Sequence, residues 1–395
     1  MRGIICGAGI SGLSLAWWLD RAEWDVLVIE RTLGLRDEGY MIDFLSSGYD
    51  VAELMGLIPR LKEIHYPIPE MIYVDRNGRR VAGLDYKLFY QLQKGRVFNF
   101  MRGDLERVLF EELPESVDVR FGLTIDQVKP SEEYVEVLLS NEEHERADLL
   151  VGADGIHSRV RKLVFGEEHQ FLRPLGFHTA AYIFEDEELR RELGGEFRLL
   201  SVPNRQIGLY PIRDGKVASF FVHRTPDKAL PSSHCEQLDK VYGDLTWVVP
   251  AALQHCRDYS KIYYDLVAQI EMSQWSQGRV ALVGDACQAV SLLAGQGASM
   301  AMAGAYLLAR ELRDNRPVKE CLTEYEAHLK PIIARKQAAG RRTAYWFVPP
   351  SQRGIAARNA LLRLGGLPGL SWLLRPVLTS GTESVVEHTS EAAHT

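Results

Sequence analysis

The sequence predicts an α/β fold that combines a discontinuous, mostly parallel-sheet lobe, an antiparallel β-sheet lobe and C-terminal helices. Residues 2–31 have the pattern of a strand, a glycine turn, a helix and a second strand, which is a βαβ opening. Between residues 170 and 275 apolar and polar positions alternate instead, as in an antiparallel sheet. From Arg279 the strand, turn and helix pattern returns, so the first lobe resumes after the second.

The first part of the parallel-sheet lobe is expected at residues 1–169. After the βαβ opening, the pattern predicts a helix, a strand, a hairpin strand and a buried strand, in that order, at 104–113, 117–121, 134–139 and 148–151. The antiparallel lobe is expected at residues 170–275. Its clearest strands are 197–202 and 217–222, with a turn at Arg213-Asp-Gly215 between them.

The second part of the parallel-sheet lobe is expected at residues 276–345. It contains a predicted strand at 280–283 and predicted helices at 298–312 and 319–346. Residues 346–380 are expected to form a C-terminal helical segment. The polar residues 381–395 are expected to be a disordered tail.

The composition excludes several classes of partner. The 395 residues are 46% hydrophobic and 25% charged, which suits a chain with a large core in two lobes. The net charge of −7 leaves no positive excess for nucleic acid, so small or neutral ligands fit better. Five scattered cysteines without a CxxC pair argue against a disulfide framework, a zinc site or a dithiol redox centre. They predict a reducing, cytoplasmic setting.

Two segments bear on membrane association. The N-terminus lacks the basic and then apolar stretch of a signal peptide. The apolar segment Ala360 to Leu378 is interrupted by two arginines, a proline and three glycines, so it does not read as a spanning helix. It favours a packed terminal helix or lid over a membrane-surface anchor. We therefore expect no stable membrane insertion. Separately, we expect the protein to be a monomer or a homodimer.

A dinucleotide fingerprint lies in the βαβ opening. Gly7, Gly9 and Gly12 follow the first strand and open the helix, where glycine permits a tight turn, close approach of a pyrophosphate and close helix packing. Glu30 ends the next strand, where a carboxylate can accept hydrogen bonds from an adenosine ribose. These residues predict dinucleotide binding but do not separate NAD from FAD. The structural alternative is three packing glycines and an exposed Glu30.

Two further segments carry acids at strand ends. In Asp148-Leu-Leu-Val-Gly-Ala-Asp-Gly-Ile-His-Ser-Arg-Val-Arg161, Asp154 directly follows a predicted strand and precedes a basic helix start. In Arg279-Val-Ala-Leu-Val-Gly-Asp-Ala286, Asp285 follows another strand, with Ala294-Gly-Gln-Gly-Ala298 and a helix of small residues behind it. Acids at the carboxyl ends of strands lie at the usual ligand edge of an open α/β sheet.

These three segments, in this order and spacing, resemble the single-component FAD-dependent monooxygenases of the aromatic (p-hydroxybenzoate) hydroxylase type, including the tetracycline-inactivating flavin monooxygenases. The resemblance covers residues 1 to about 345. It implies a Rossmann-like lobe that holds FAD in an extended conformation. It also implies that the antiparallel sheet roofs the isoalloxazine and the substrate.

The resemblance implies roles for residues that spacing alone does not assign. Asp154 and Arg159 would support FAD and the passing nicotinamide cofactor, and Asp285 would bind the ribityl chain or the pyrophosphate. The backbone around Gly295 and Gly297 would face the flavin ring.

Four more residues complete the implied cofactor-binding set. Arg102, in Arg102-Gly-Asp-Leu105, would contact the flavin nucleotide. Asp43 would contact the flavin, and Arg36 would contact NADPH. Arg31, next to Glu30, is also included. Without the resemblance, Arg102 would pair with a carboxylate, Asp43 would cap a helix or turn, and Arg36 would be a solvated loop charge.

Two positions depart from the family pattern. The usual histidine three residues after Asp285 is Gln288, and the usual proline over the flavin is Leu292. Glutamine cannot titrate, so this position is not an essential acid or base. Leucine makes the expected flavin-facing wall more apolar than usual.

The resemblance implies the following reaction. NADPH or NADH reduces FAD, the reduced ring traps O2 as a C4a-hydroperoxide, and one oxygen atom passes to an aromatic or polyketide-like small molecule. No catalytic side chain is predicted, because the flavin carries the chemistry. Two alternatives remain open: a flavin-dependent reductase or dehydrogenase of the isoprenoid-saturating kind, and a flavoprotein binding module with a non-redox role. Halogenation is disfavoured because Trp247 stands without the paired-tryptophan WxWxIP signature.

Overall fold

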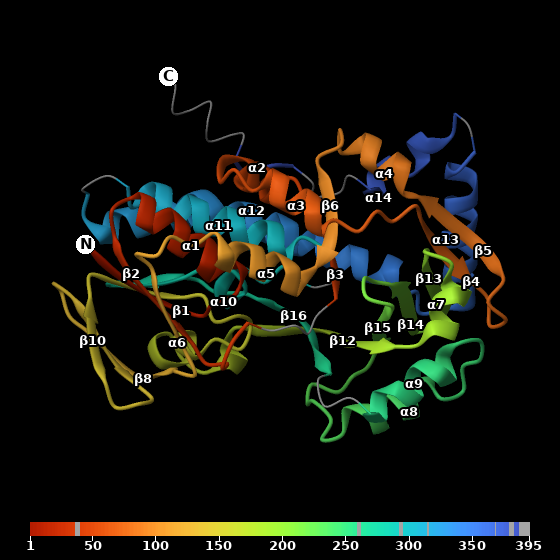
Figure 1. Cartoon of the computed structure of the whole chain (residues 1–395), viewed down its shortest axis with the longest axis horizontal. Coiled ribbons are helices and arrows are strands. Elements are labelled where there is room, and N and C mark those ends of the chain that lie inside the picture. Colours follow the sequence, from red (N-terminus) through yellow and green to blue (C-terminus); the bar gives the residue numbers. More distant parts are fainter. Residues whose placement is uncertain are drawn as a thin grey trace.

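The structure is a computed structural model that describes residues 1–35, 40–258, 262–291, 295–313, 316–367, 369–378 and 383–386. Two lobes lie side by side, and long helices cover the upper side of the first lobe in the view of Figure 1. The first lobe carries a six-stranded sheet and the second a seven-stranded sheet. This arrangement confirms the predicted fold class of a mostly parallel sheet, an antiparallel sheet and C-terminal helices.

The six-stranded sheet has the order β17-β18-β11-β1-β2-β7. Its strands in that order are Ser276–Gln277, Val280–Leu282, Leu149–Gly152, Arg2–Cys6, Asp25–Glu30 and Asp118–Phe121. All neighbours are parallel except β17 and β18. Ile5 lies opposite Val28 on one side and Val151 on the other. The lobe is discontinuous in sequence, as predicted, because β18 belongs to this sheet although it follows the second lobe along the chain.

Helices cover this sheet because its central strands are apolar on both faces. Helix α1 (Ile10–Arg21) is buried almost all round, between the sheet and α11 (Gly297–Glu311). Helix α12 (Val318–Phe347) packs against α11 in turn. The predicted helices at 298–312 and 319–346 are therefore confirmed. Helix α5 (Arg102–Glu111) also packs on α1, and a small sheet of β8, β9 and β10 lies at the lobe's edge (Ile125–Pro130, Val135–Leu139, His144–Ala147).

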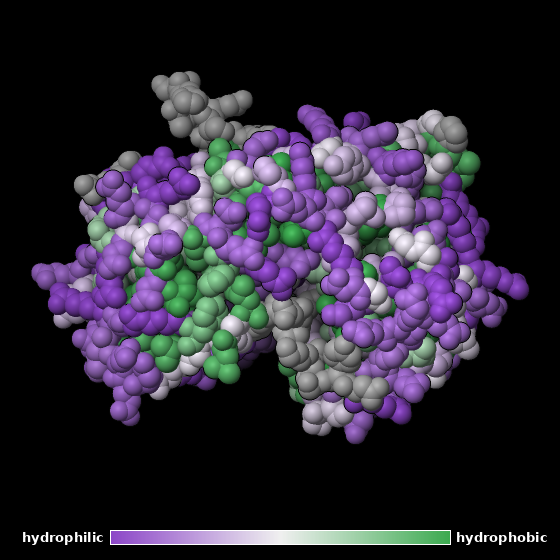
Figure 2. Space-filling model, viewed as in Figure 1, coloured by the Kyte–Doolittle hydropathy of each residue, from purple (hydrophilic) through white to green (hydrophobic). Residues whose placement is uncertain are grey.

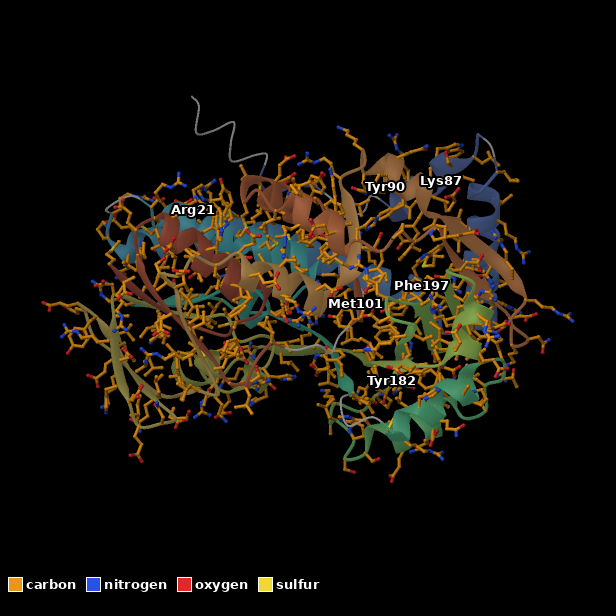
Figure 3. All side chains as sticks on the ribbon, viewed as in Figure 1. Arg21, Lys87, Tyr90, Met101, Tyr182 and Phe197 are labelled. Atoms are coloured by element: carbon orange, nitrogen blue, oxygen red, sulfur yellow. A yellow bond between two sulfur atoms is a disulfide. The ribbon has the colours of Figure 1, made fainter. Side chains whose placement is uncertain are left out.

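The seven-stranded sheet has the order β16-β12-β15-β14-β13-β4-β5. Its strands in that order are Tyr263–Ile270, Leu172–Glu185, Lys216–Arg224, Arg205–Pro211, Phe197–Val202, Glu70–Val74 and Arg80–Asp85. Neighbours are antiparallel except β13 and β4. The sheet thus extends beyond the predicted 170–275, because β4 pairs with a strand more than a hundred residues away. Tyr182 and Phe197, labelled in Figure 3, belong to this sheet.

Helices α7, α8 and α9 belong to the second lobe (Glu187–Leu193, His234–Tyr242, Val249–Asp258). Helices α8 and α9 pack together and place the Cα atoms of Cys235 and Cys256 5.7 Å apart, joined by a disulfide. The sequence argument against disulfides is therefore wrong for this pair, because tertiary packing, and not a spacing motif, brings the two cysteines together. The cytoplasmic setting stays a prediction without that support.

A two-stranded sheet of β3 (Met41–Leu45) and β6 (Val97–Met101) lies between the two lobes in Figure 1. The remaining shorter helices are α2, α3, α4, α6, α10 and the 3-10 turn η1, at Ser47–Leu54, Ile58–Ile64, Tyr86–Leu92, Arg159–Val164, Asp285–Gln288 and Glu168–Gln170. None of the helices among the described residues has both the length and the apolar character that crossing a bilayer requires.

The C-terminal segment packs on the second lobe. It forms α13 (Gln352–Gly365), the 3-10 turn η3 (Ser371–Leu373) and α14 (Arg375–Leu378), and α13 contacts β5 and β13. The prediction of a disordered tail over 381–395 is wrong for 383–386. Val385 and Val386 are buried in the core of the first lobe, and the Val385 amide donates to Ser47 Oγ (2.9 Å).

Candidate active site

A cavity of about 640 Å³ lies at the carboxyl ends of the parallel strands. Residues that follow β1, β2 and β11 form one wall, and residues of β16 form another, so both lobes contribute. This is the edge at which an open α/β sheet binds its ligand. Of the predicted cofactor-binding residues, ten line the cavity: Gly7, Gly9, Glu30, Arg31, Arg102, Asp154, Arg159, Asp285, Gly295 and Gly297.

The glycine turn after β1 has no room for side chains. Gly7 has φ +113°, and a Cβ there would lie 2.5 Å from the Ala153 carbonyl oxygen. A Cβ on Gly12 would overlap the Gly7 carbonyl oxygen, so Gly12 permits α1 to pack on β1 without lining the cavity. No described side chain caps the N-terminus of α1, which leaves its first amides for a phosphate. The turn therefore fits the pyrophosphate of a dinucleotide.

Glu30 stands beside this turn at the end of β2. Its Oε2 accepts a hydrogen bond from the Ala8 amide (2.9 Å), and its Oε1 accepts from the Thr32 amide (2.9 Å) and hydroxyl (2.8 Å). These bonds hold the carboxylate in the cavity wall. Arg31 lines the same wall and is exposed.

Asp154 organises the loop after β11. Its carboxylate accepts hydrogen bonds from the Ser158 hydroxyl (2.5 Å) and from the Arg159 and Val160 amides (2.7 and 3.1 Å). Desolvation raises the pKa of Asp154, while these hydrogen bonds act to lower it. The Arg159 guanidinium pairs with Asp126 (2.7 Å), so Asp154 and Arg159 lie together on the cavity wall but point to different partners.

Arg102, Glu106 and Asp285 form a charged cluster in the wall. Arg102 Nη2 lies 2.8 Å from Glu106 Oε1 one helical turn later, and Glu106 is 3% exposed. Asp285 is open to the cavity yet surrounded by protein, so desolvation raises its pKa and the Arg102 charge lowers it. The sequence analysis missed Glu106, because an Arg and Glu pair at this spacing is typical of a solvated helix face.

Two predicted positions, Asp43 and Gln288, do not line this cavity. The Asp43 carboxylate accepts from the Tyr86 hydroxyl (3.2 Å) and from the side-chain amide of Asn99, and desolvation raises its pKa to about 6. Arg36 and Leu292 lie outside the described residues. Gln288 is also absent from the wall, since it is buried and donates to the Tyr325 hydroxyl (2.5 Å) between helices.

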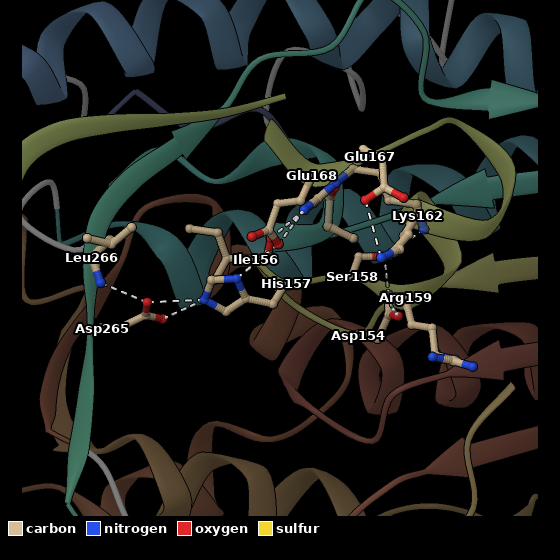
Figure 4. A network of polar contacts seen from close by, with 12 residues as sticks. Asp154, Ile156, His157, Ser158, Arg159, Lys162, Glu167, Glu168, Asp265 and Leu266 are labelled. Carbon is tan, nitrogen blue, oxygen red and sulfur yellow. Dashed lines mark hydrogen bonds and ion pairs between the residues drawn. The ribbon is translucent and has the colours of Figure 1, made fainter. Parts of the chain in front are cut away.

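A polar network connects the two lobes beside the cavity, as Figure 4 shows. His157, two residues after the Asp-Gly pair, contacts Asp265 of β16 through Nε2 (3.1 Å) and Glu168 through Nδ1 (3.0 Å). The hydrogen bond to Asp265 is the largest cause that raises the pKa of His157, to about 9. The sequence analysis gave His157 and Asp265 no role. The histidine two residues after the Asp-Gly pair was the only hint in the sequence. Its partner Asp265 could not be foreseen, because it comes from the other lobe.

Aromatic rings stand where the cavity meets the seven-stranded sheet. The ring centroid of Tyr40 lies 5.6 Å from that of Tyr263 and 5.9 Å from that of Phe220, and both tyrosines line the cavity. Phe221 and His223, by contrast, are buried in the core of the second lobe. Tyr210 is also buried, and its hydroxyl accepts from the Met41 amide (2.7 Å).

Comparison with known proteins gives three informative similarities. An uncharacterized protein of Mycobacterium tuberculosis is 32% identical over 320 residues, which cover 78% of this chain and 84% of that protein. A flavin-dependent monooxygenase of Legionella longbeachae is 27% identical, over 85% and 87% of the two chains. The crystal structure of the tetracycline destructase Tet(55) superposes with a TM-score of 0.81 at 25% identity, over 96% of this chain and 97% of that chain.

Fold, site and similarities together define the class of the molecule as an FAD-dependent monooxygenase that acts on small molecules. The sequence profile of the FAD binding domain family matches residues 1–337. The chain belongs to this family.

Proposed function

We propose that this enzyme uses NADPH or NADH to reduce bound FAD and inserts one oxygen atom from O2 into an aromatic or polyketide-like small molecule. The observation that carries the substrate class is the aromatic cluster of Tyr40, Tyr263 and Phe220 at the sheet side of the cavity. Flat rings at such spacings favour a flat, unsaturated ligand by stacking and edge contacts. Tet(55) is named for the breakdown of tetracycline, a fused-ring polyketide, which agrees with this substrate class.

The residues of the first lobe would hold FAD along the cavity. The Gly7 to Gly12 turn and the first amides of α1 suit the pyrophosphate, and Glu30 suits the adenosine ribose. Arg102 and Asp285 supply a cation and an acceptor further along the same wall. Bound FAD would supply the redox chemistry, while the protein supplies position, charge and dryness.

The protein's own contribution to the reaction is exclusion of water and orientation. The rings of Tyr40 and Tyr263 restrict water at the sheet side of the cavity, and Phe220 packs beside Tyr40. Asp265 and His157 join the two lobes beside the cavity, so they fix the position of the seven-stranded sheet relative to the six-stranded sheet.

Stopped-flow spectroscopy with isotopically labelled O2 tests this proposal. NADPH or NADH is added to the FAD-loaded enzyme under argon, and labelled O2 is then admitted with tetracycline or p-hydroxybenzoate as probes. We expect the nucleotide to bleach the flavin and a product to gain one labelled oxygen atom. Reduction of a carbon double bond under argon would support the reductase instead, and a flavin that neither nucleotide reduces would support the binding module.

A matched pair of variants tests the aromatic cluster. Tyr263→Ala should retain FAD but divert reduced flavin to hydrogen peroxide, with the yield of oxygenated product falling about tenfold or more. Tyr90→Ala, at an exposed tyrosine on α4, should leave that yield unchanged. An equal product yield from both variants would contradict a role for the cluster in substrate binding.

A further inference from the structure

Helix α13 has an apolar side turned inward and an outer side on which apolar residues alternate with arginines. Ile355, Leu362 and Gly365 are buried. The exposed residues on the other side of the helix include Ala356, Ala357, Ala360 and Leu364 together with Arg353 and Arg363. An outer side that combines apolar residues with cations, and carries no acid, is typical of a helix that lies at a membrane interface.

The helix is firmly attached, so its outer side is fixed in place. Arg358 is 1% exposed, and its guanidinium stacks 3.8 Å from the centre of the Tyr73 ring on β4. Its Nη1 donates to the Phe347 carbonyl (3.1 Å) and to Gln206 Oε1 (3.3 Å). Because the helix is already fixed, binding of a partner to its outer side would not have to order this segment and so would lose little conformational entropy.

Large apolar side chains are also exposed at the end of the helix and in the residues that follow it. Leu364, Leu367 and Trp372 are 48%, 51% and 64% exposed, and they fall within nine residues of one another. In Figure 2 a few apolar residues show among hydrophilic ones at the upper right, over the region where Figure 1 places the C-terminal helices. We call Ala356, Ala357, Ala360, Leu364, Leu367 and Trp372 the outer apolar strip.

The charge around the strip is positive. Residues 349–378 contain four arginines and no lysine, aspartate or glutamate, in a chain of net charge −7. Arg353, Arg363 and Arg375 are exposed, while Arg358 is the buried anchor. Helix α4, which contacts α14, adds exposed Lys87 and Tyr90 on the same side of the molecule (Figure 3). The acids of the strands beneath are engaged, Glu70 with Arg80 (2.7 Å) and Asp85 as the N-cap of α4.

We propose that the outer apolar strip and its flanking cations dock reversibly on an anionic phospholipid surface. Leucine and tryptophan side chains enter the headgroup boundary while arginine and lysine pair with lipid phosphates, which is the pattern of an interfacial helix. A symmetric contact with a second copy would instead bring together two segments that each expose Arg353 and Arg363 and contain no acid, so like charges would face one another. The inner side of the helix packs on the protein, as predicted, and its outer side contacts the lipid surface.

Vesicle cosedimentation with the full-length, FAD-loaded protein tests this proposal. The probes are vesicles of phosphatidylcholine alone and vesicles in which about a quarter of the lipid is phosphatidylglycerol. We expect binding to the anionic vesicles only, and its loss at high salt, because each cation near such a surface contributes about fivefold in affinity and salt screens it. The absence of binding to anionic vesicles at low salt would overturn the proposal.

Matched variants locate the contact. Leu364→Ser combined with Trp372→Ser should weaken vesicle binding about tenfold or more, because two inserted side chains are lost. Lys87→Gln combined with Arg353→Gln should weaken it about twentyfold, as two cations are lost. Arg21→Gln, on the distant first lobe labelled in Figure 3, is the control and should leave binding unchanged.

Two outcomes would overturn the assignment even if vesicles bind. If all these variants bound vesicles equally and unfolded at the same temperature, the lipid contact would have to lie elsewhere on the molecule. Self-association that depends on protein concentration, and that Leu364→Ser with Trp372→Ser abolishes while vesicles are ignored, would assign the strip to a second copy instead. Flavin absorbance of each variant reports that the first lobe is intact, so the result does not depend on the proposed reaction.

Discussion

At the scale of single residues, the cavity wall presents the exposed Asp285 carboxylate to a ligand. Desolvation raises its pKa, and the Arg102 charge lowers it. A hydroxyl of bound FAD that donates to this carboxylate would form a strong hydrogen bond, because the acceptor is charged.

Asp285→Asn should therefore weaken FAD binding about tenfold or more, the equivalent of about 1.4 kcal/mol. The matched control is Asp118→Asn, at the opposite, amino end of the parallel strand β7. Fluorescence titration of the apoprotein with FAD measures both dissociation constants. Equal affinity of the two variants would remove Asp285 from the cofactor site.

The pair of His157 and Asp265 gives the molecule a pH dependence. The pKa of His157 is raised from its ordinary value of 6.5 to about 9, first by the hydrogen bond to Asp265. A raised folded-state pKa means that this stabilisation is complete below about pH 6.5 and is lost as the pH rises through about 9.

His157→Gln should accordingly flatten this part of the stability profile. Wild-type protein should lose about 1 kcal/mol or less relative to the variant between pH 6.5 and 9, a small value because the imidazole is partly exposed. Chemical denaturation at a series of pH values measures it. A parallel decline in both proteins would show that the imidazole does not hold the lobes together through its charge.

Residue-level prediction from sequence depended on local rules. Gly7, Gly9 and Asp154 were predicted because glycine turns and acids at strand ends have fixed places relative to a parallel sheet, and all three line the cavity. Glu106 and Asp265 were missed because their roles depend on partners that only the fold brings near, across a helix turn in one case and across the lobes in the other.

At the scale of elements, the contact between α1 and β1 depends on Gly12. A side chain there would overlap the Gly7 carbonyl oxygen, and α1 is the helix that carries the phosphate-binding turn to the sheet. This contact leaves no space for an additional methyl group, since protein interiors are packed as densely as crystals of small organic molecules.

Gly12→Ala should destabilise the apoprotein by about 3 kcal/mol, the upper range for an overpacked core. Gly34→Ala, where a Cβ would meet no atom within 4 Å, is the control and should change stability by less than about 0.5 kcal/mol. Thermal unfolding in the absence of FAD separates this packing effect from ligand binding. A fully stable Gly12→Ala variant would show that α1 can shift away from β1.

Element prediction was limited by pairing over long distances. The helices at 298–312 and 319–346 followed from periodicity within their own sequence and are present within a few residues of the predicted ends. Strands β4 and β5 were not assigned to the second lobe, because their apolar alternation carries no information about their partner β13. The packed residues 383–386 were too short to stand out from a polar tail.

At the scale of the whole molecule, the two lobes share one cavity, and neither forms it alone. The first lobe supplies the glycine turn and the charged wall, and β16 of the second lobe supplies Tyr263 and Asp265. Binding of one ligand along this wall would therefore stabilise both lobes together. Saturation at a hundred times the dissociation constant would add about 2.7 kcal/mol to the free energy of unfolding.

Titration of the apoprotein with FAD and, separately, with FMN is the most direct test of the account. FMN lacks the adenosine half that the Gly7 to Gly12 turn and Glu30 are proposed to hold. We expect one FAD per chain, seen by native mass spectrometry and by a rise in unfolding temperature, and binding of FMN weaker by at least about a hundredfold. A chain that binds neither cofactor, or that binds the two equally well, would contradict the proposed site.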